Sequence, residues 1–535
     1  MRLIISVLTQ KTDAAKTNDD LGRTEPAGLP PAPVTADHYF STTHLAKDLK
    51  GRTISSGLVT AVAQGLQFAL TLGSTMVLAR LLTPRDFGLV AMVWTVMGVL
   101  RVFKEAGLST ATVQREGITH AQVSNLFWIN VAVSGLISLL VAAAAPAIAW
   151  FYREPRLTGI TIALSTTFFL AGSAVQHQAL LSRQMRFKAI ALIQVGSALA
   201  GVLVGVGMAW LHYGYWSLVG LNLTTGLVAL GLTALASRWR PQFFTRSSGT
   251  RPMLYFGANL TAGAFFYSIA RGLDGLLIGR FYGAVSVGLY SRALAMLARP
   301  LEQVMCPIES VLIPMFSRLQ CQPERYQRVF LQVYEAIVLA SCLFTGMFFA
   351  LAQPLTLVLL GPKWGEVAVI FAGFTFAALQ YSIAASTTWL FASQGRGRDS
   401  FLASFICSLI VAVSVVAGLP FGPAGVAISY SAASIAVQLP VLFWLAGRSG
   451  PVSTTDLWTG FLRHLPLWAV VCGASWLAHA AMLTASPLAQ LAICAPVGLL
   501  AGAVFIFVYA PARRVAMEVI SLLPEIKKAS GGTTP

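Results

Sequence analysis

Fourteen long apolar segments dominate the chain from residue 57 onward, and short polar stretches separate them. Each has about 20 to 30 residues, the length that an α-helix needs to cross the hydrocarbon core of a bilayer. Because only 11% of the 535 residues are charged, against roughly a quarter in soluble domains, we expect an all-α polytopic membrane protein with about 14 transmembrane helices. The predicted spans are 57–79, 86–108, 125–150, 157–181, 189–211, 214–237, 253–279, 285–314, 329–351, 366–392, 400–420, 423–446, 461–481 and 487–510.

The two ends of the chain lie outside these spans. Residues 1–52 are polar, and seven basic residues balance six acidic ones, which is typical of a disordered tail. The apolar run Leu3 to Leu8 is too short for a signal-peptide core, so we expect no cleaved leader. Residues 511–535 form a second tail. Within the membrane part, Pro354 to Gly361 could extend the ninth span or form a separate short helix.

Basic residues are distributed unequally between the connections. With the N-terminus inside, the even-numbered connections and the flanking tails hold 22 Lys and Arg, whereas the odd-numbered connections hold six. Cytoplasmic loops of membrane proteins carry such an excess. The sequence therefore predicts that both termini are cytoplasmic. It also indicates that the net charge of +17 reports orientation and not nucleic-acid binding.

An internal repeat relates the two halves of the chain. Arg80 and Gly88 of the first hairpin recur 200 residues later as Arg280 and Gly288, and the tight turns 212–214 and 420–422 also correspond. Parallel repeats of this kind form two lobes about an axis along the membrane normal. We therefore expect two pseudo-symmetric six-helix lobes plus two appended helices. The expected units are a disordered cytoplasmic tail (1–52), the N-terminal lobe (53–240), the C-terminal lobe (241–450), two additional transmembrane helices (451–510) and a cytoplasmic tail (511–535).

Nine charged residues fall inside the apolar segments, where each would cost at least about 2.5–3.5 kcal/mol if it faced lipid. The four in the eighth segment are spaced by 7, 3 and 7 residues, so they share one helix face of about 80°. As a set, the nine must face a wet cavity or one another. They are Arg101, Lys104, Glu105, Arg271, Asp274, Arg292, Arg299, Glu302 and Glu309.

Uncharged polar residues extend this pattern. They line one face of the first span at Thr60, Gln64, Gln67, Thr71 and Ser74. The strongest stripes belong to the first, second, seventh and eighth spans, which are the corresponding hairpins of the two repeats. A polar cavity between the lobes is therefore expected.

The charges in this cavity favour an anionic ligand, because five are basic and four acidic. Arg292 has no acidic residue three or four positions away, and a guanidinium offers a fork of donors that matches phosphate oxygens. A structural alternative stays open, since the pairs Arg271–Asp274 and Arg299–Glu302 could neutralise each other and Arg101 to Glu105 could snorkel. On the functional interpretation, the substrate-binding residues are Arg292, Arg299, Arg271, Arg101 and Lys104.

Other chemistries find little support in the sequence. The six cysteines are never closer than 15 residues, and the seven histidines form no HExxH motif, so we predict no metal site and no cofactor. No phosphate-binding loop of the GxxxxGK[ST] type is present. His177 in the fourth span is interpreted as a core residue.

Three stretches resemble the polysaccharide-transporter branch of the multidrug/oligosaccharidyl-lipid/polysaccharide exporter superfamily, the Wzx-type flippases. Residues 79–88 resemble the first-hairpin motif of that family, and residues 181–188 resemble the loop after its fourth span. Residues 274–314, which include Gly288-Leu289-Tyr290-Ser291-Arg292, are similar to its signature for the seventh and eighth spans. The resemblance covers about residues 45–450.

This resemblance implies a flippase and not an enzyme. Such a carrier moves an undecaprenyl-pyrophosphate-linked oligosaccharide across the bacterial inner membrane by alternating access, for exopolysaccharide, capsule or O-antigen synthesis. The cationic residues would shield the pyrophosphate. Glu302, Glu309 and Asp274 would balance charge or bind a coupling ion. Expected partners are membrane lipids, a polysaccharide polymerase and a co-polymerase.

Three alternatives remain at this point. A peptidoglycan lipid-precursor flippase would handle a related substrate. A multidrug antiporter shares the fold, but it would prefer acidic residues in its lumen. A membrane glycosyltransferase or polymerase would need catalytic groups on a sizeable external loop, whereas the outside connections here have no more than about 15 residues.

Overall fold

The computed structural model describes residues 49–104, 112, 118–243 and 251–518, with the backbone alone over 49–58, 99–104 and 251–271 and at four positions between 304 and 310. The predicted N-terminal tail therefore lies outside the described residues, except that 49–52 already belong to the first helix. All regular elements in the described ranges are helical. The predicted all-α fold is confirmed.

Six helices form the N-terminal lobe, and each corresponds to one predicted span. A capping box begins the third of them, because the side chains of Thr119 and Gln122 each accept the other's backbone N–H, which satisfies groups that a helix start leaves unpaired. The helices are α2 (Leu49–Leu81), α3 (Pro84–Lys104), α5 (His120–Tyr152), α6 (Leu157–Arg183), α7 (Phe187–Trp210) and α8 (Trp216–Ser237).

The C-terminal lobe begins with α9 (Arg251–Arg318), which contains the seventh and eighth spans. At Gly283 the backbone leaves the helical conformation with φ 77° and ψ −176°, which glycine adopts without a Cβ clash. The chain then continues through α10 (Pro323–Ala350), α11 (Ala352–Leu359), η3 (Pro362–Trp364), α12 (Val367–Ser393), α13 (Gly397–Gly418), η4 (Leu419–Phe421), α14 (Gly422–Ala433), η5 (Ser434–Gln438) and α15 (Leu439–Gly447). The segment at 354–361 thus belongs largely to a separate short helix, α11.

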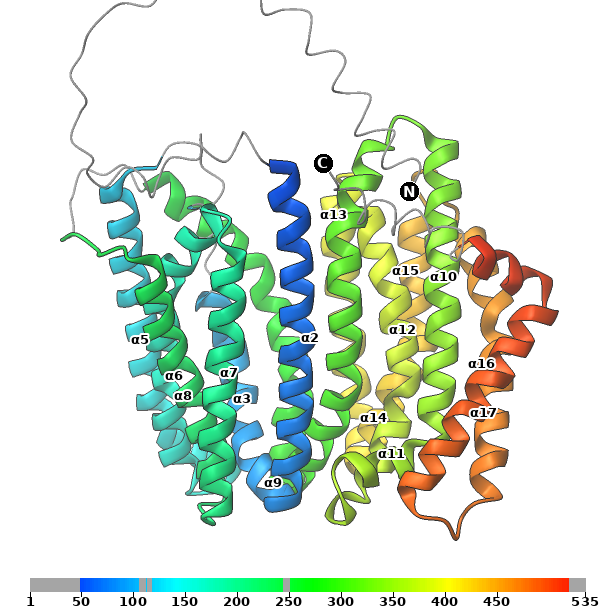
Figure 1. Cartoon of the computed structure of the whole chain (residues 1–535), viewed down its shortest axis with the longest axis horizontal. Helices are drawn as coiled ribbons and strands as arrows, with labels where there is room; N and C mark the ends of the chain where they lie inside the picture. The colour runs from blue at the N-terminus through cyan, green and yellow to red at the C-terminus, as the bar shows by residue number, and fades with distance from the viewer. Residues whose placement is uncertain (1–48, 105–111, 113–117, 244–250, 519–535) are drawn as a thin grey trace, which may run out of the picture.

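Two further helices, α16 (Thr454–Ala480) and α17 (Pro487–Val508), follow the second lobe. They pack against α10 at the edge of the helical array (Figure 1). The chain remains helical over 510–518, so the predicted C-terminal tail starts with an ordered turn of helix.

Eleven helices of the described chain are long and apolar enough to cross a membrane. The range Gly397–Gly447 among them contains two antiparallel passes joined by η4, and α9 makes a pass on each side of Gly283. Together with α3, the described helices make fourteen passes. Because this number is even, α2 begins at the same end of the array as α17 finishes (Figure 1).

Equivalent contacts in the two lobes confirm the pseudo-symmetry. In the first lobe, Nη1 of Arg186 donates to the carbonyl O of Ala236 at 2.7 Å. In the second lobe, Nη1 of Arg396 donates to the carbonyl O of Ala446 at 2.8 Å. Both pairs are 50 residues apart in sequence and join the start of one span to the end of the next. The two halves therefore repeat the same tertiary contact.

One apolar core crosses from lobe to lobe. It joins side chains of α2, α3, α5 and α6 with side chains of α9, α11, α12 and α14. A second core joins the C-terminal lobe to the first appended helix, between α9, α10, α12, α15 and α16. The lobes are therefore packed tightly together at the end that carries the hairpin turns.

Candidate functional site

The two repeated hairpins meet back to back. A Cβ on Gly88 would overlap the carbonyl O of Ala284, and a Cβ on Gly288 would overlap the carbonyl O of Pro84. Each glycine also lies against the backbone N of the other. Since Pro84 and Ala284 are themselves equivalent positions, the contact has a local twofold symmetry. The predicted hairpin residues Gly88 and Gly288 thus let two helices approach at backbone distance.

The arginines of the hairpin motif reach across to the opposite lobe. Nη2 of Arg80 donates to the carbonyl O of Val358 at 2.9 Å, and Nε1 of Trp364 donates to the carbonyl O of Ala79 at 2.8 Å. In the equivalent place of the other repeat, Cζ of Arg280 lies 5.9 Å from the ring centroid of Phe151. We call these contacts between hairpin and opposite lobe the outer clamp.

Arg292 lies beside the outer clamp, one turn of helix beyond Gly288. Its Cζ is 4.9 Å from the ring centroid of Phe87 in α3. Its Nε is buried and has no hydrogen-bond partner. Within the described part of the chain, this guanidinium makes no ion pair. An uncompensated cation in the membrane is costly, and an anionic ligand would satisfy it.

Asp274 lies in the first half of α9. Its Oδ2 accepts the hydroxyl of Tyr290 at 2.9 Å, and its Oδ1 accepts the backbone N–H of Gly275 at 2.7 Å. Tyr290 is buried. The carboxylate is therefore held by a side chain two residues from Arg292.

The rest of the charged stripe follows the second half of α9. Arg299 is exposed, whereas Glu302 and Glu309 are half-buried. Next to Glu302, Nε2 of Gln303 donates to the carbonyl O of Gln64 in α2 at 3.0 Å. This bond places the stripe against the polar face of the first span, at the seam between the lobes.

Several predicted residues cannot be placed in this site. The backbone of Arg101 and Lys104 belongs to α3 and that of Arg271 to α9, but their side chains lie outside the described residues. Glu105 lies outside them altogether. The structure brings together Arg292 and the outer clamp, whereas Asp274 bonds to Tyr290, which lies on nearly the opposite face of α9 from Arg292.

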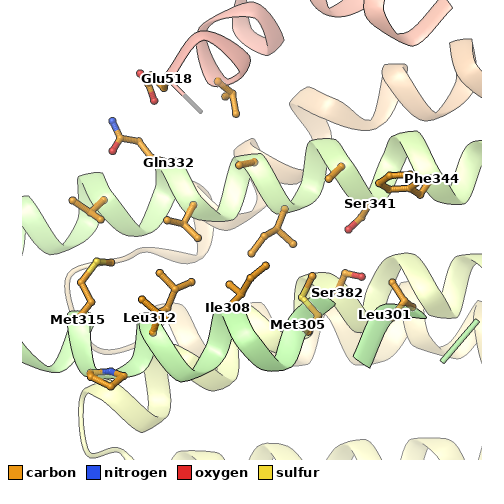
Figure 2. Close-up of a pocket in the computed structure, with 18 of the residues that line it drawn as sticks. Leu301, Met305, Ile308, Leu312, Met315, Gln332, Ser341, Phe344, Ser382 and Glu518 are labelled. Atoms are coloured by element: carbon orange, nitrogen blue, oxygen red, sulfur yellow. The ribbon is translucent and has the colours of Figure 1, made fainter. Parts of the chain in front are cut away.

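The described residues form a groove of about 1020 Å³ within the C-terminal lobe. Apolar side chains of α9 and α10 face each other along it, among them Met305, Ile308 and Leu312 (Figure 2). Arg318 and Arg325 line one end, at the connection between the two helices. Sequence reasoning predicted a polar cavity between the lobes and missed this apolar groove.

The second half of α9 separates the groove from the charged stripe. At about 100° per residue, the groove-lining residues Leu301, Met305 and Leu312 are centred roughly 110° around the helix from the charged residues Arg299 and Glu302. One helix therefore presents charges to the lobe seam and apolar side chains to the groove.

A second group of intramembrane charges joins α10 to α16. Nη1 of Arg463 lies 3.1 Å from Oε1 of Glu335, and Nε2 of His464 lies 3.4 Å from Oε2 of the same carboxylate. His464 is fully buried, and its Nδ1 has no hydrogen-bond partner. We call this group the α10–α16 triad.

Sequence reasoning missed the α10–α16 triad, although two signals were present. Glu335 lies inside the ninth apolar segment and adds to the nine intramembrane charges. Ser453 and Asp456 form a capping box that starts α16 at Thr454, seven residues before the predicted start of that span. Arg463 and His464 therefore lie inside the helix and not at its end.

His177 is a core residue, as the sequence indicated. Its Nδ1 is 2.8 Å from Oγ of Ser237, and its ring makes edge contacts with Phe127 and Trp239. Within the described ranges, no group of three or more His, Cys, Asp or Glu could hold a metal ion.

Comparison with known proteins places this geometry in context. Residues 77–369, more than half of the chain, match the family described as polysaccharide biosynthesis protein. Lipopolysaccharide biosynthesis protein WzxC of Escherichia coli (strain K12) is 24% identical over 433 residues, which cover 79% of this chain and 87% of the relative. Succinoglycan biosynthesis transport protein ExoT of Rhizobium meliloti (strain 1021) is 26% identical over 356 residues, which cover 66% and 71%.

A solved structure shares the fold. Lipid II flippase MurJ in an inward closed conformation superposes with a TM-score of 0.66 at 14% sequence identity, covering 84% of this chain and 98% of that protein. At this level of identity the likeness concerns the arrangement of helices. It agrees with the two lobes and the appended helices described above.

Proposed function

The chain belongs to the polysaccharide biosynthesis protein family, and on that premise we propose that it is a flippase for undecaprenyl-pyrophosphate-linked oligosaccharides. It carries repeat units from the inner to the outer leaflet of the bacterial inner membrane by alternating access. The exported units then serve exopolysaccharide, capsule or O-antigen synthesis. The names of WzxC and ExoT, which refer to lipopolysaccharide biosynthesis and succinoglycan biosynthesis transport, support this class of substrate.

One observation carries the proposal: the second half of α9 has a charged side and an apolar side. A lipid-linked pyrophosphate needs both kinds of surface. Its head is an anion that loses water when it enters the membrane, and its tail is a long hydrocarbon. The charged side holds Arg292 with a buried, unpartnered Nε. The apolar side forms one wall of the groove between α9 and α10, which suits the polyprenyl chain.

The proposed roles follow from this division. Arg292 and Arg299 bind the pyrophosphate, together with Arg271, Arg101 and Lys104 from the facing parts of the two hairpins. Asp274, Glu302 and Glu309 limit the positive charge, so that the anion is released after crossing. The same carboxylates are candidates for a coupling ion.

The remaining assignments complete the proposal. Both termini are cytoplasmic, in accord with the excess of 22 basic residues over six. The lobe boundaries are 53–240 and 241–450, with the appended pair at 451–510. The protein transports and does not catalyse, and it works beside a polymerase and a co-polymerase that use the exported unit.

Two substitutions test the substrate site. Arg292→Ala and Arg299→Ala should abolish surface polysaccharide while protein levels stay normal, and lipid-linked repeat units should accumulate on the cytoplasmic leaflet. Arg240→Ala removes the same group from an exposed position and serves as the matched control. Full polymer production by both cavity variants would overturn the assignment of these residues.

Extraction of the trapped lipid after deletion of the gene tests the substrate class. An undecaprenyl pyrophosphate that carries an oligosaccharide repeat unit is expected. A trapped peptidoglycan precursor would instead assign the protein to the related flippase class. Unchanged lipid intermediates together with sensitivity to cationic drugs would contradict both and favour a multidrug antiporter.

A further inference from the structure

One aromatic ring connects Arg292 with the outer clamp. The ring of Phe87 lies under the guanidinium of Arg292 at 4.9 Å. The same ring meets the indole of Trp364 edge to face, with centroids 5.3 Å apart and an interplanar angle of 78°. Trp364 in turn donates its Nε1–H to the carbonyl O of Ala79 at 2.8 Å.

These four residues alternate between the lobes. Ala79 and Phe87 belong to the N-terminal lobe, whereas Arg292 and Trp364 belong to the C-terminal lobe. Phe87 and Trp364 are almost fully buried, with 5% and 0% exposure, so neither ring has room to move alone. The lobes cannot separate at this end without breaking the Trp364–Ala79 hydrogen bond and both contacts of Phe87.

The cation above Phe87 stabilises this arrangement. A guanidinium over a ring face contributes about 0.5–1 kcal/mol when exposed and about 2 kcal/mol or more when desolvated. The Nε of Arg292 is buried without a hydrogen-bond partner. This Nε–H is therefore available to an anion that binds Arg292.

We propose that Phe87 couples occupancy of Arg292 to opening of the outer clamp. When a pyrophosphate draws the guanidinium away, Phe87 loses its cation, its contact with Trp364 weakens, and separation of the lobes at this end becomes easier. The ligand thus favours the outward-open state because it binds Arg292 better there, which is the condition for any ligand-driven shift. This inference rests on the proposed function, since it takes an anionic lipid headgroup as the ligand.

The coupling must act in both directions, because linked binding equilibria are reciprocal. Trp364→Phe retains an aromatic ring beside Phe87 but removes the N–H that bonds Ala79. This substitution should loosen the clamp and raise the affinity for undecaprenyl pyrophosphate. Typical allosteric couplings correspond to about 5-fold to 150-fold changes in affinity, and we expect a value near the lower end.

The test measures lobe separation in the full-length protein. Nitroxide labels at Pro155→Cys and Glu366→Cys, in a background without native cysteines, mark exposed positions near the outer end of each lobe. Distance distributions in nanodiscs are recorded with and without undecaprenyl pyrophosphate. Binding of the radiolabelled lipid is measured in parallel.

The matched control uses the other aromatic contact across the seam. Phe151→Leu removes a ring that faces Arg280 at 5.9 Å and leaves Arg292 and Phe87 untouched. The wild type and Phe151→Leu should shift toward longer distances on addition of the lipid. Phe87→Leu lacks the ring from which the lipid must draw the guanidinium, so it should bind the lipid about 2-fold to 30-fold more tightly than the wild type and show no shift.

The outcomes separate the two proposals. A ligand-dependent shift in Phe87→Leu equal to that of the wild type, or no gain of affinity in Trp364→Phe, would overturn the coupling and leave the flippase assignment standing. Absence of lipid binding to the wild type would overturn the proposed function and the coupling with it. Because Trp364→Phe tests the same link through affinity, a poorly folded Phe87→Leu protein does not remove the test.

Discussion

Gly88 of α3 and Gly288 of α9 occupy equivalent positions in the two halves of the chain. Each lies so close to the backbone of the opposite hairpin that a side chain at its position would clash with that backbone. Two transmembrane helices can approach this closely only where small residues line the contact. The seam between the lobes is therefore built around a pair of glycines on the pseudo-twofold axis. The charged residues of the proposed site lie beside this seam.

Replacement of either glycine should disturb the seam. Gly88→Ala or Gly288→Ala should lower the free energy of unfolding in detergent by about 1–3 kcal/mol, the usual cost of overpacking a tight contact. Each substitution should also reduce transport, because it holds the hairpins apart. Gly73→Ala is the control, because a Cβ there meets nothing within 4 Å. Equal thermal stability of all three variants in a detergent melting assay would contradict the close packing.

A larger side chain in the groove between α9 and α10 should slow transport. Ala340 lines it and is exposed, so Ala340→Trp should fill part of the volume and slow transport of long polyprenyl substrates. A short-chain analogue should be affected less, because it needs less of the groove. Initial rates of lipid-linked sugar translocation in proteoliposomes measure this difference. Leu139→Trp on the exposed surface of α5 should behave as the wild type, and equal rates for all proteins would argue against a role of the groove.

The α10–α16 triad should hold the appended helices in place. Glu335→Ala leaves Arg463 and the buried His464 without their shared carboxylate, and a buried polar group left without its partner costs about 1–3 kcal/mol. We expect a lower melting temperature and faster proteolysis between α15 and α16. Glu335→Gln keeps a hydrogen-bond acceptor and should recover part of the loss. A melting temperature unchanged in Glu335→Ala would show that packing alone attaches α16.

The equivalent arginines Arg186 and Arg396 should contribute unequally to the stability of the protein. Arg396 donates to the carbonyl oxygens of Leu445, Ala446 and Ser449, whereas the described bond of Arg186 goes to Ala236. Charged hydrogen bonds contribute roughly 1.5–3 kcal/mol each. Arg396→Ala should therefore destabilise the protein more than Arg186→Ala. Equilibrium unfolding in mixed micelles checks the order, and the reverse order would contradict the bond assignments.

Much of the architecture could be predicted from local sequence. The spans were found because a helix must be apolar over about 20 residues to stay in lipid. The predicted end of the first span at residue 79 and start of the second at residue 86 lie close to the observed end of α2 at Leu81 and start of α3 at Pro84. The start of α16 was placed seven residues late, so that Arg463 and His464 fell at the edge of the predicted span. Their charges are tolerated there because Glu335 of another helix pairs with them, and that contact is not a property of either segment alone.

The sequence by itself determined the membrane class, the number of passes and the twofold repeat, since each follows from the order and spacing of residues along the chain. It also singled out Arg292 as a cation without a partner on its own helix. Only the tertiary structure decided that Phe87 lies beneath Arg292, that Trp364 reaches Ala79, and that the apolar groove lies behind the charged stripe. These relationships join residues from different helices, and the rotation of each helix about its axis is set by packing against its neighbours.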